Sequence, residues 1–357
     1  MKQQPILIFF ILLLIILSII YAFQSNNNKQ SKFSQLVSHL TSPIVNGQTA
    51  FYFKIKSFND GVPIIKIALG NQNSNKLLAI YDTGSSFLNI SSTDCTSCDL
   101  SQGAYEIPAD IKKEKFRHTT TIEYGSQIDN VISMTDVLQL PLSSNEEEQR
   151  SLDVPFNVTI DRKQGTTGNS NNNVFGGGQE YGSLNSYILP ASFSIVCDLR
   201  TDREMYIAGY SEQKVRKVKD ACGKRFAQVP LFKTIQLPYY VLEVDTVDSG
   251  SFSTDTIDYI IVDTGSNYTS LPPLLYEDVQ KAINQSLNPS VNIHFFNKES
   301  LTLSRNNLFW KHTYELMLDD DTTALPQDYH ENTIILGCYA LSERVILFSK
   351  NTFQFSC

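Results

Sequence analysis

The chain has 357 residues, of which 41% are hydrophobic and 18% are charged, a composition typical of globular proteins with a substantial core. Its 37 acidic and 29 basic side chains leave a formal net charge of −8 at pH 7. The longest cationic run, Lys214–Lys219, is too short to neutralise a row of phosphates. The charge balance therefore argues against nucleic acid as a partner.

The N-terminus is apolar at first and then polar. Residues 6–23 are almost unbroken hydrophobics behind Lys2, so we expect residues 1–22 to be a secretory signal peptide. Ile20-Tyr21-Ala22 is a poor cleavage site, and the apolar segment is long enough to remain as a membrane tether instead. The Gln/Asn/Ser-rich residues that follow predict a short pro-segment at 23–50. The chain is thus expected in the secretory pathway, either secreted or in a lysosome or vacuole.

Cysteine usage agrees with an oxidising compartment, because the six cysteines are an even number: Cys95, Cys98, Cys197, Cys222, Cys338 and Cys357. Up to three disulfides are expected. Cys95–Cys98 is the nearest local pair, and proximity in sequence suggests Cys197–Cys222 and Cys338–Cys357. A zinc site at the first pair needs a second ligand pair that the sequence lacks, so no metal is expected.

From Phe51 onward, short alternating or β-branched runs are interrupted by Gly, Asn, Asp and Pro, as in Ile64–Gly70 and Leu77–Tyr81. This rhythm predicts an all-β fold. Helical periodicity is convincing only in short stretches such as Pro273–Leu287. Polar stretches predict two surface loops and a lysine-rich connector between two halves, at Ser143–Arg150, Gly165–Asn173 and Ser211–Lys224.

The two halves contain the same local pattern, an apolar strand running into Asp-Thr-Gly-Ser. It occurs at Leu78–Ser86 and again at Tyr259–Asn267, which places Asp82 and Asp263 in equivalent positions. One such tetrad would be an ordinary Asp/Gly turn. Two copies, each behind a β-branched strand and half a chain apart, indicate a duplicated site.

An Asp at the end of a buried strand is costly unless its carboxylate is hydrogen-bonded or paired. The residues after each Asp can supply such partners. We expect a glycine that allows a sharp turn with its N–H near the carboxylate, a serine hydroxyl at the outer carboxylate oxygen, and a threonine that locks the two turns together. These residues are Gly84 and Gly265, Ser85 and Ser266, and Thr83 and Thr264.

With both tetrads, the sequence from about Phe51 to its end resembles the pepsin-like aspartic proteases. The resemblance implies a bilobal fold of two pseudo-symmetric β-rich lobes with a cleft between them. Residues 51–212 would form the N-terminal lobe, with Asp82 and a flap, and residues 213–357 the C-terminal lobe, with Asp263. It also implies that Asp82 and Asp263 are the catalytic pair.

Weaker matches follow in the family's order. Ile122–Ser126 resembles the flap hairpin that covers bound substrate, which implies substrate-binding roles for Tyr124 and Gly125, together with Gly84, Gly265 and Ser266 of the turns. Val174–Gly176 and Ile335–Gly337 resemble the hydrophobic-hydrophobic-Gly element that threads beneath each catalytic turn. Met205–Gly209 resembles the strand that closes the first lobe. Val345–Phe348 resembles the strand near the end of the second lobe.

Several residues depart from the family's pattern. Asn89 stands where many members carry the Trp that hydrogen-bonds the flap Tyr, and Cys338 replaces the Asp that commonly follows Ile-Leu-Gly. The expected pro-segment is short and has only Lys29 and Lys32 as basic residues. These departures leave open how the flap is held and how a zymogen is inhibited.

Four Asn-x-Ser/Thr sites accompany the expected secretion, at Asn89, Asn157, Asn267 and Asn284. Glycans at Asn89 or Asn267 would obstruct a cleft around the catalytic pair. We therefore expect carriers only at Asn157 and Asn284.

The resemblance implies an aspartic endopeptidase that hydrolyses polypeptides at acidic pH through a water activated between Asp82 and Asp263, without cofactor or metal. Because one chain carries both Asp residues, a monomer is expected. The sequence has no Gly-x-Ser-x-Gly elbow, no His-Glu-x-x-His pair and no phosphate-binding glycine loop. The alternative is a catalytically silent pepsin-like protein that binds a peptide or protein in the cleft.

Overall fold

The structure is a computed structural model, and parts of the chain are outside its description. It describes residues 52–55, 57–59, 62–70, 76–115, 118–124, 127–141, 149–164, 173–178, 192–198, 204–210, 219–220, 225–233, 239–309, 315–322, 325, 327–342, 344–349 and 351–356. The predicted signal peptide at 1–22, its alternative as a tether at 6–23 and the pro-segment at 23–50 lie outside these residues. Within them, no helix has the length and apolar character needed to span a membrane.

The described chain is mostly β-sheet, which confirms the all-β prediction. The first half has one described helix, α2 (Ala109–Lys115). Its strands are β1 (Tyr52–Ile55), β2 (Ser57–Asn59), β3 (Val62–Leu69), β4 (Lys76–Asp82), β5 (Leu88–Ser91), β6 (Thr120–Tyr124), β7 (Gln127–Pro141), β8 (Gln149–Gln164), β9 (Asn173–Gly176), β10 (Ser192–Asp198) and β11 (Glu204–Tyr210).

Shorter strands and most of the described helices belong to the second half. The helices are α5 (Pro273–Gln285), α6 (Arg305–Leu308), η1 (Gln327–Tyr329) and η2 (Cys338–Leu341). The strands are β12 (Phe226–Pro230), β13 (Tyr240–Glu243), β14 (Thr246–Ser249), β15 (Phe252–Thr254), β16 (Tyr259–Asp263), β17 (Thr269–Ser270), β18 (Ser290–His294), β19 (Ser300–Ser304), β20 (Leu318–Asp319), β21 (Thr333–Gly337), β22 (Val345–Ser349) and β23 (Thr352–Ser356).

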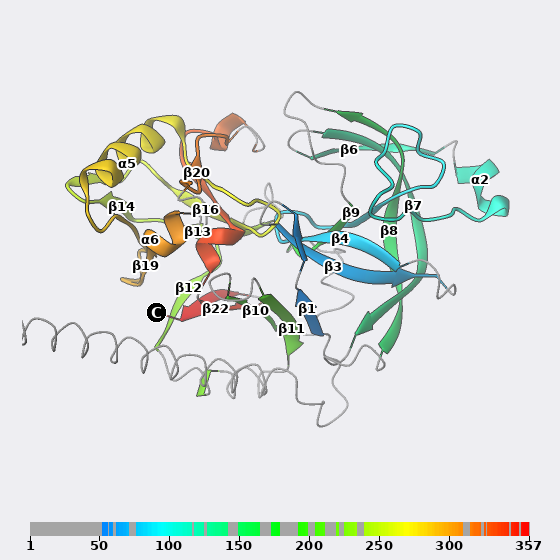
Figure 1. Cartoon of the computed structure of the whole chain (residues 1–357), viewed down its shortest axis with the longest axis horizontal. Coiled ribbons are helices and arrows are strands. Elements are labelled where there is room, and N and C mark those ends of the chain that lie inside the picture. The colour runs from blue at the N-terminus through cyan, green and yellow to red at the C-terminus, as the bar shows by residue number, and fades with distance from the viewer. Residues whose placement is uncertain are drawn as a thin grey trace, which may run out of the picture.

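Each half has its own sheets, which lie on opposite sides of the molecule in Figure 1. The first half forms an eight-stranded sheet in the order β2-β3-β4-β9-β5-β8-β7-β6. The second half forms a five-stranded sheet, β13-β16-β21-β17-β20, and a four-stranded sheet, β15-β14-β18-β19.

A five-strand unit is repeated in the two halves. In the first half it is β3-β4-β9-β5-β8 and in the second β13-β16-β21-β17-β20. When the strands of each unit are numbered in chain order, they lie in the sheet in the order first, second, fifth, third, fourth. In both units the four successive pairings are antiparallel, parallel, antiparallel and parallel. The internal repeat of the sequence is therefore part of a repeat of sheet topology, with Asp82 and Asp263 at the ends of equivalent strands.

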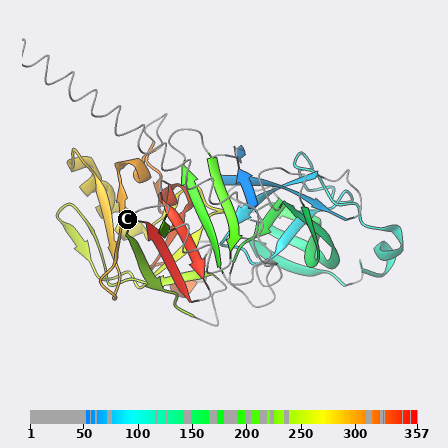
Figure 2. The same cartoon turned by 90° about the horizontal axis from the view of Figure 1, so that it is seen from below.

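A six-stranded antiparallel sheet joins the halves, with three strands from each, in the order β1-β11-β10-β22-β23-β12. The junction is the pairing of β10 with β22, in which Ile195 lies opposite Ile346. Figure 2 shows these green and red strands side by side. The predicted boundary between residues 212 and 213 falls in the chain between β11, the last strand from the first half, and β12, the first strand from the second half.

A predicted helix and two predicted loops outside the site have different outcomes. The predicted surface loop at Ser143–Arg150 is wrong at its end, because Gln149 and Arg150 belong to β8. The predicted helix at Pro273–Leu287 is confirmed as α5, which begins with Pro273 and buries Leu275, Val279 and Ile283 on one face. The predicted surface loop at Gly165–Asn173 is wrong at its end. Asn173 begins β9, is buried, and accepts a hydrogen bond from the Ser91 N–H (2.8 Å), because its amide satisfies backbone groups of neighbouring strands.

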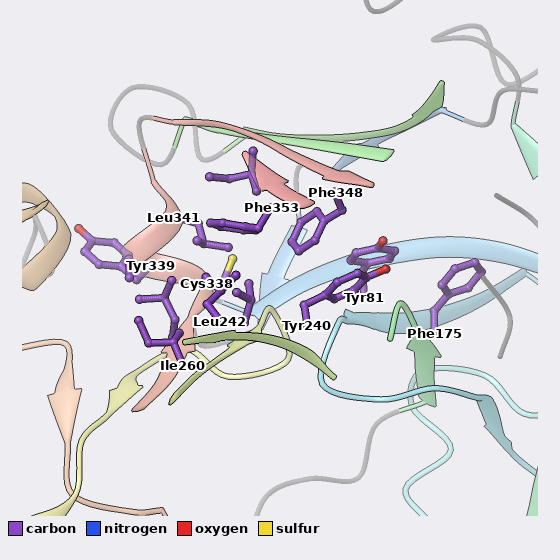
Figure 3. Packing of buried hydrophobic residues seen from close by; sticks show 14 of the residues in the cluster. Tyr81, Phe175, Tyr240, Leu242, Ile260, Cys338, Tyr339, Leu341, Phe348 and Phe353 are labelled. Atoms are coloured by element: carbon purple, nitrogen blue, oxygen red, sulfur yellow. The ribbon is translucent and has the colours of Figure 1, made fainter. Parts of the chain in front are cut away.

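Aromatic side chains from both halves pack together below the ends of β4 and β16. Tyr81 lies 5.9 Å from Phe175 between ring centroids, and Tyr240 lies 4.5 Å from Phe348. Figure 3 shows Tyr81 and Tyr240 beside each other, with Phe348 above them. The halves thus share one continuous hydrophobic core, and Phe348 of the six-stranded sheet is part of it.

Phe348→Ala tests how much this shared core stabilises the fold. Phe348 is 1% exposed, so its removal leaves a cavity and should lower the free energy of unfolding by about 3–5 kcal/mol. Phe296→Ala is the matched control, because Phe296 is 68% exposed and should change stability by less than about 0.5 kcal/mol. Equilibrium urea unfolding measures both, and equal midpoints for the two variants would contradict the packing described.

Candidate active site

The two Asp-Thr-Gly-Ser turns begin where β4 and β16 end. Each Asp is the last residue of its strand and lies opposite the glycine that ends the parallel strand beside it, so that Asp82 pairs with Gly176 and Asp263 with Gly337. The chain then holds the turns from below. The Gly177 N–H donates to the Asp82 carbonyl (2.6 Å), and the Cys338 N–H donates to the Ser266 carbonyl (2.8 Å).

Glycine is required at both of these crossings. A Cβ on Gly176 would lie 2.5 Å from the Phe87 nitrogen, and one on Gly337 would lie 2.6 Å from the Tyr268 carbonyl carbon. No side chain fits where the backbones approach this closely. The two hydrophobic-hydrophobic-Gly elements therefore lie beneath the turns, as the sequence predicted.

The two turns are joined by reciprocal hydrogen bonds of Thr83 and Thr264. The Thr83 hydroxyl donates to the Val262 carbonyl and the Thr264 hydroxyl donates to the Tyr81 carbonyl, both at 2.8 Å. Each hydroxyl also accepts the backbone N–H of the other threonine at 3.0 Å. Because both side chains are completely buried, these bonds lock the turns against each other, as the sequence indicated.

Gly84 and Gly265 bring the two carboxyl groups together. Each glycine N–H donates to the Oδ1 of the Asp in its own turn at 2.7 Å. Each glycine also lies against the opposite Asp. A Cβ on Gly84 would lie 2.7 Å from Asp263 Oδ1, and one on Gly265 would lie 2.5 Å from Asp82 Oδ1. Because Gly84 and Gly265 have no side chain, the carboxyl group of the opposite Asp fits against each of them.

The two serines behave differently. The Ser85 hydroxyl donates to Asp82 Oδ2, as expected. The expectation for Ser266 is wrong, because its hydroxyl donates instead to the Tyr268 carbonyl at 2.8 Å. The serine hydroxyl at Asp82 therefore has no matching bond from Ser266 at Asp263.

Burial and the neighbouring carboxyl group perturb Asp263. Loss of solvent raises its pKa well above the usual range, and the charge of Asp82 and the hydrogen bond between the two carboxyl groups raise it further. The N–H groups of Gly265 and Ser266 act in the opposite direction and lower this pKa. Because the effects that raise the pKa of Asp263 outweigh those that lower it, the pair retains one proton at pH values where an isolated Asp would have lost it.

The proposed flap is described only in part. β6 and β7 form an antiparallel hairpin in which Tyr124 lies opposite Gln127. Gly125 and Ser126 lie outside the described residues, and so does the side chain of Tyr124. The substrate-binding roles of Tyr124 and Gly125 therefore stay predictions.

Asn89 belongs to a polar cluster that the sequence did not reveal. It is completely buried, and its Nδ2 donates to Asp129 Oδ2 at 2.9 Å. Asp129 is also paired with Arg162, at 2.8 Å between Nε and Oδ1. Asn89, Asp129 and Arg162 are far apart in the sequence and belong to no common motif. In strands that alternate apolar and polar residues, charged side chains are normally assigned to the solvent face. No sequence signal therefore identified this cluster.

Cysteine pairing agrees with the sequence at one position and differs at another. The predicted Cys95–Cys98 disulfide is confirmed. The predicted Cys338–Cys357 pair is wrong, because Cys338 is a buried free thiol. Cys338 begins η2 under the second turn and points into the core near Leu341 and Phe353 (Figure 3), where packing rather than a disulfide determines its place. Cys222 of the remaining predicted pair, Cys197–Cys222, lies outside the described residues.

The two expected glycan carriers differ in exposure. Asn284 is exposed on α5. Asn157 is buried on β8, and its Oδ1 accepts the Ser133 hydroxyl at 3.0 Å. Burial argues against a glycan at Asn157, because the bulky sugar requires a surface side chain.

Comparison with known proteins adds no assignment, since neither a protein-family model nor a curated protein matches this chain. Within the described residues, no group of three or more His, Cys, Asp or Glu side chains is arranged to hold a metal ion. The chemistry of the site must therefore be inferred from the two turns themselves.

Thr264→Val tests the lock between the turns. Valine keeps the shape but removes the hydrogen bond to the Tyr81 carbonyl and leaves the buried Thr83 N–H without its acceptor, so stability should fall by about 2–5 kcal/mol. Thr256→Val, at an exposed threonine, should change it by less than about 0.5 kcal/mol. Thermal and urea unfolding measure both variants. A Thr264→Val protein as stable as the control would show that the hydroxyl does not hold the turns.

Proposed function

We propose that this chain is an aspartic endopeptidase of the pepsin-like type, with a bilobal fold in which the two five-strand units are the centres of pseudo-symmetric lobes and a cleft between them binds the substrate. The observation that carries the proposal is the meeting of Asp82 and Asp263. Two equivalent strand ends bring their carboxyl groups against each other's glycine, where burial and mutual repulsion make them share a proton.

The hydrogen bonds around the pair fit a dyad that keeps one proton. The Gly84 N–H and the Ser85 hydroxyl donate to Asp82, and the Gly265 N–H donates to Asp263. Burial and the neighbouring Asp82 carboxyl group raise the pKa of Asp263. One member of the pair is then protonated while the other is ionised, and the two share the proton.

This arrangement supports hydrolysis without a covalent intermediate. A water held by both carboxyl groups attacks the peptide carbonyl carbon while the ionised member of the pair, Asp82 or Asp263, takes a proton from the water. The protonated member donates its proton to the carbonyl oxygen, where negative charge develops. The resulting tetrahedral diol then breaks its C–N bond as the proton taken from water passes to the leaving nitrogen. A hydroxyl of the diol returns its proton to the other carboxylate as the carboxylic acid product forms. The substrate class is polypeptide, and one chain supplies both acids, so a monomer suffices.

The proposed setting is an acidic compartment of the secretory pathway or the secreted fluid. The Cys95–Cys98 disulfide is the kind of bond that persists in oxidising compartments. A pepsin-like protein that only binds peptides is the alternative, and the departure at Asn89 motivated it. The complete set of turn residues at both Asp positions favours catalysis, because a binding protein needs neither a shared proton nor two opposed glycines.

Asp82→Asn and Asp263→Asn should each abolish peptide hydrolysis while the fold is retained. An amide can act neither as the base nor as the acid, and such groups contribute about 10²–10⁴-fold to rate. Asp255→Asn, at an exposed Asp, is the matched control and should keep wild-type activity. The measurement is cleavage of a denatured protein at acidic pH, with circular dichroism as the check of folding. More than about a tenth of the wild-type kcat in either folded dyad variant would refute the assignment.

The pH profile of kcat/KM should be a bell on the acid side. Because the pKa of Asp263 is raised, the shared proton is kept at mildly acidic pH and lost as the pH rises further, which leaves two carboxylates and no acid. At lower pH the second carboxyl group is protonated and no base remains. The maximum is expected at about pH 3–5. A maximum at or above pH 7, measured on protein freed of any pro-segment, would contradict the shared-proton mechanism.

A further inference from the structure

Four buried polar side chains meet between strands β5, β7 and β8 of the first half. Asn89, Asp129 and Thr159 are completely buried, and Arg162 is 4% exposed. Removing a carboxylate and a guanidinium from water is costly and is tolerated only with excellent hydrogen-bond geometry. A cluster of this kind is therefore tied to one arrangement of the strands that carry it.

Asp129 is the centre of this network. Its carboxylate binds Arg162 in a two-point contact, with Nε 2.8 Å from Oδ1 and Nη2 2.9 Å from Oδ2. The Asn89 amide donates to Oδ2 at 2.9 Å. The Thr159 hydroxyl lies 3.0 Å from the same oxygen and 3.1 Å from Asn89 Oδ1, so it can donate to either.

A β-bulge in β8 makes this convergence possible. Thr159 and Arg162 are three residues apart, and on a regular strand such residues point to opposite faces. The register between β7 and β8 shifts between Asn130 and Val131, which adds one residue to β8. The extra residue brings Thr159 and Arg162 to the same side of the sheet, where both reach Asp129.

The network connects the first catalytic turn to the β6–β7 hairpin. Asn89 lies on β5, seven residues after Asp82 along the chain. Asp129 lies on β7 opposite Ile122 of β6, and Ile122 is two residues before Tyr124. A hydrogen bond from Asn89 to Asp129 therefore joins the strand that leaves the catalytic turn to the proposed flap.

The disulfide loop supports the same corner from the other side. Ser97, between Cys95 and Cys98, accepts the Arg162 N–H at 2.8 Å and donates to Asp161 Oδ1 at 2.8 Å. The backbone of Arg162 is thus held by the loop while its side chain is held by Asp129. Both contacts fix the bulged part of β8.

At the equivalent place, the described residues of the second half form a different contact. Ser270 lies seven residues after Asp263, as Asn89 does after Asp82, and its hydroxyl bonds with Asp319 of β20. In the described sheet β20 is the last strand, with no hairpin beyond it. Among the described residues, the buried ion pair is therefore a feature of the first half that the repeat does not reproduce.

We propose that Asn89, Asp129, Thr159 and Arg162 are positioning residues that fix the β6–β7 hairpin relative to the first catalytic turn. Asp129 and Arg162 hold β7 to β8, and Asn89 connects this pair to β5. The effect on turnover rests on the proposed protease function, whereas the effect on the hairpin does not. Loosening it should weaken substrate binding and leave the proton chemistry of Asp82 and Asp263 unchanged.

Asn89→Ala tests the device without leaving a charge unpaired, because the Asp129–Arg162 pair stays complete. Ser270→Ala is the matched control, since it removes a buried hydrogen bond at the equivalent position of the other half. Amide hydrogen exchange in residues 120–131 should quicken about tenfold in Asn89→Ala and stay at the wild-type rate in Ser270→Ala. Unchanged exchange in Asn89→Ala would overturn the proposal whether or not the protein is a protease.

Peptide hydrolysis provides the second measurement. In Asn89→Ala, KM should rise about five- to tenfold while kcat changes less than about twofold and the pH profile keeps its two apparent pKa values. A shifted pH profile would mean that Asn89 acts on the carboxyl pair, and would overturn a positioning role. If the wild-type protein cleaves nothing, the proposed function fails, and the exchange measurement alone decides whether the network holds the hairpin.

Discussion

The reciprocal hydrogen bonds of Thr83 and Thr264 are the constraint on which the site depends. Each threonine belongs to one half and binds the backbone of the other, so neither turn can move without breaking buried bonds of its partner. This fixed separation places the carboxyl group of Asp82 against Gly265 and that of Asp263 against Gly84. Two carboxyl groups held so closely cannot both be charged, and the shared proton follows from the geometry.

The site combines symmetry with a few departures from it. The repeated five-strand unit provides two equivalent strand ends and two equivalent glycine crossings. The serines then differ, because Ser85 binds its carboxylate whereas Ser266 binds a carbonyl. This difference gives the two carboxyl groups unlike hydrogen-bond partners. Among the residues that the structure describes, the β6–β7 hairpin and the Asp129 network belong to the first half, and they make the surroundings of the pair unequal as well.

Local features of the sequence predicted much of the site, whereas contacts between residues far apart in the chain could not be predicted from local patterns. Asp82, Thr83 and Gly84 act through bonds within their own turn or its copy, so the repeated tetrad predicted their places. The pairing of β9 with β4 joins residues far apart in the chain, and only the resemblance suggested it. Asp129 and Arg162 were missed because a buried ion pair has no local signature. Cys338 was assigned to the wrong pair because closeness in sequence does not orient a side chain.

The apolar floor beneath the turns completes the physical account of the pair. Tyr81 directly precedes Asp82 and is completely buried beside Phe175 and Tyr240. Burial raises the pKa of Tyr81 well above its usual value, with smaller contributions from Tyr240 and Asp82, so its hydroxyl stays neutral at any pH at which the pair would work. The same exclusion of water raises the pKa of Asp263. The floor therefore adds no charge of its own and strengthens the repulsion that makes the two carboxyl groups keep one proton between them.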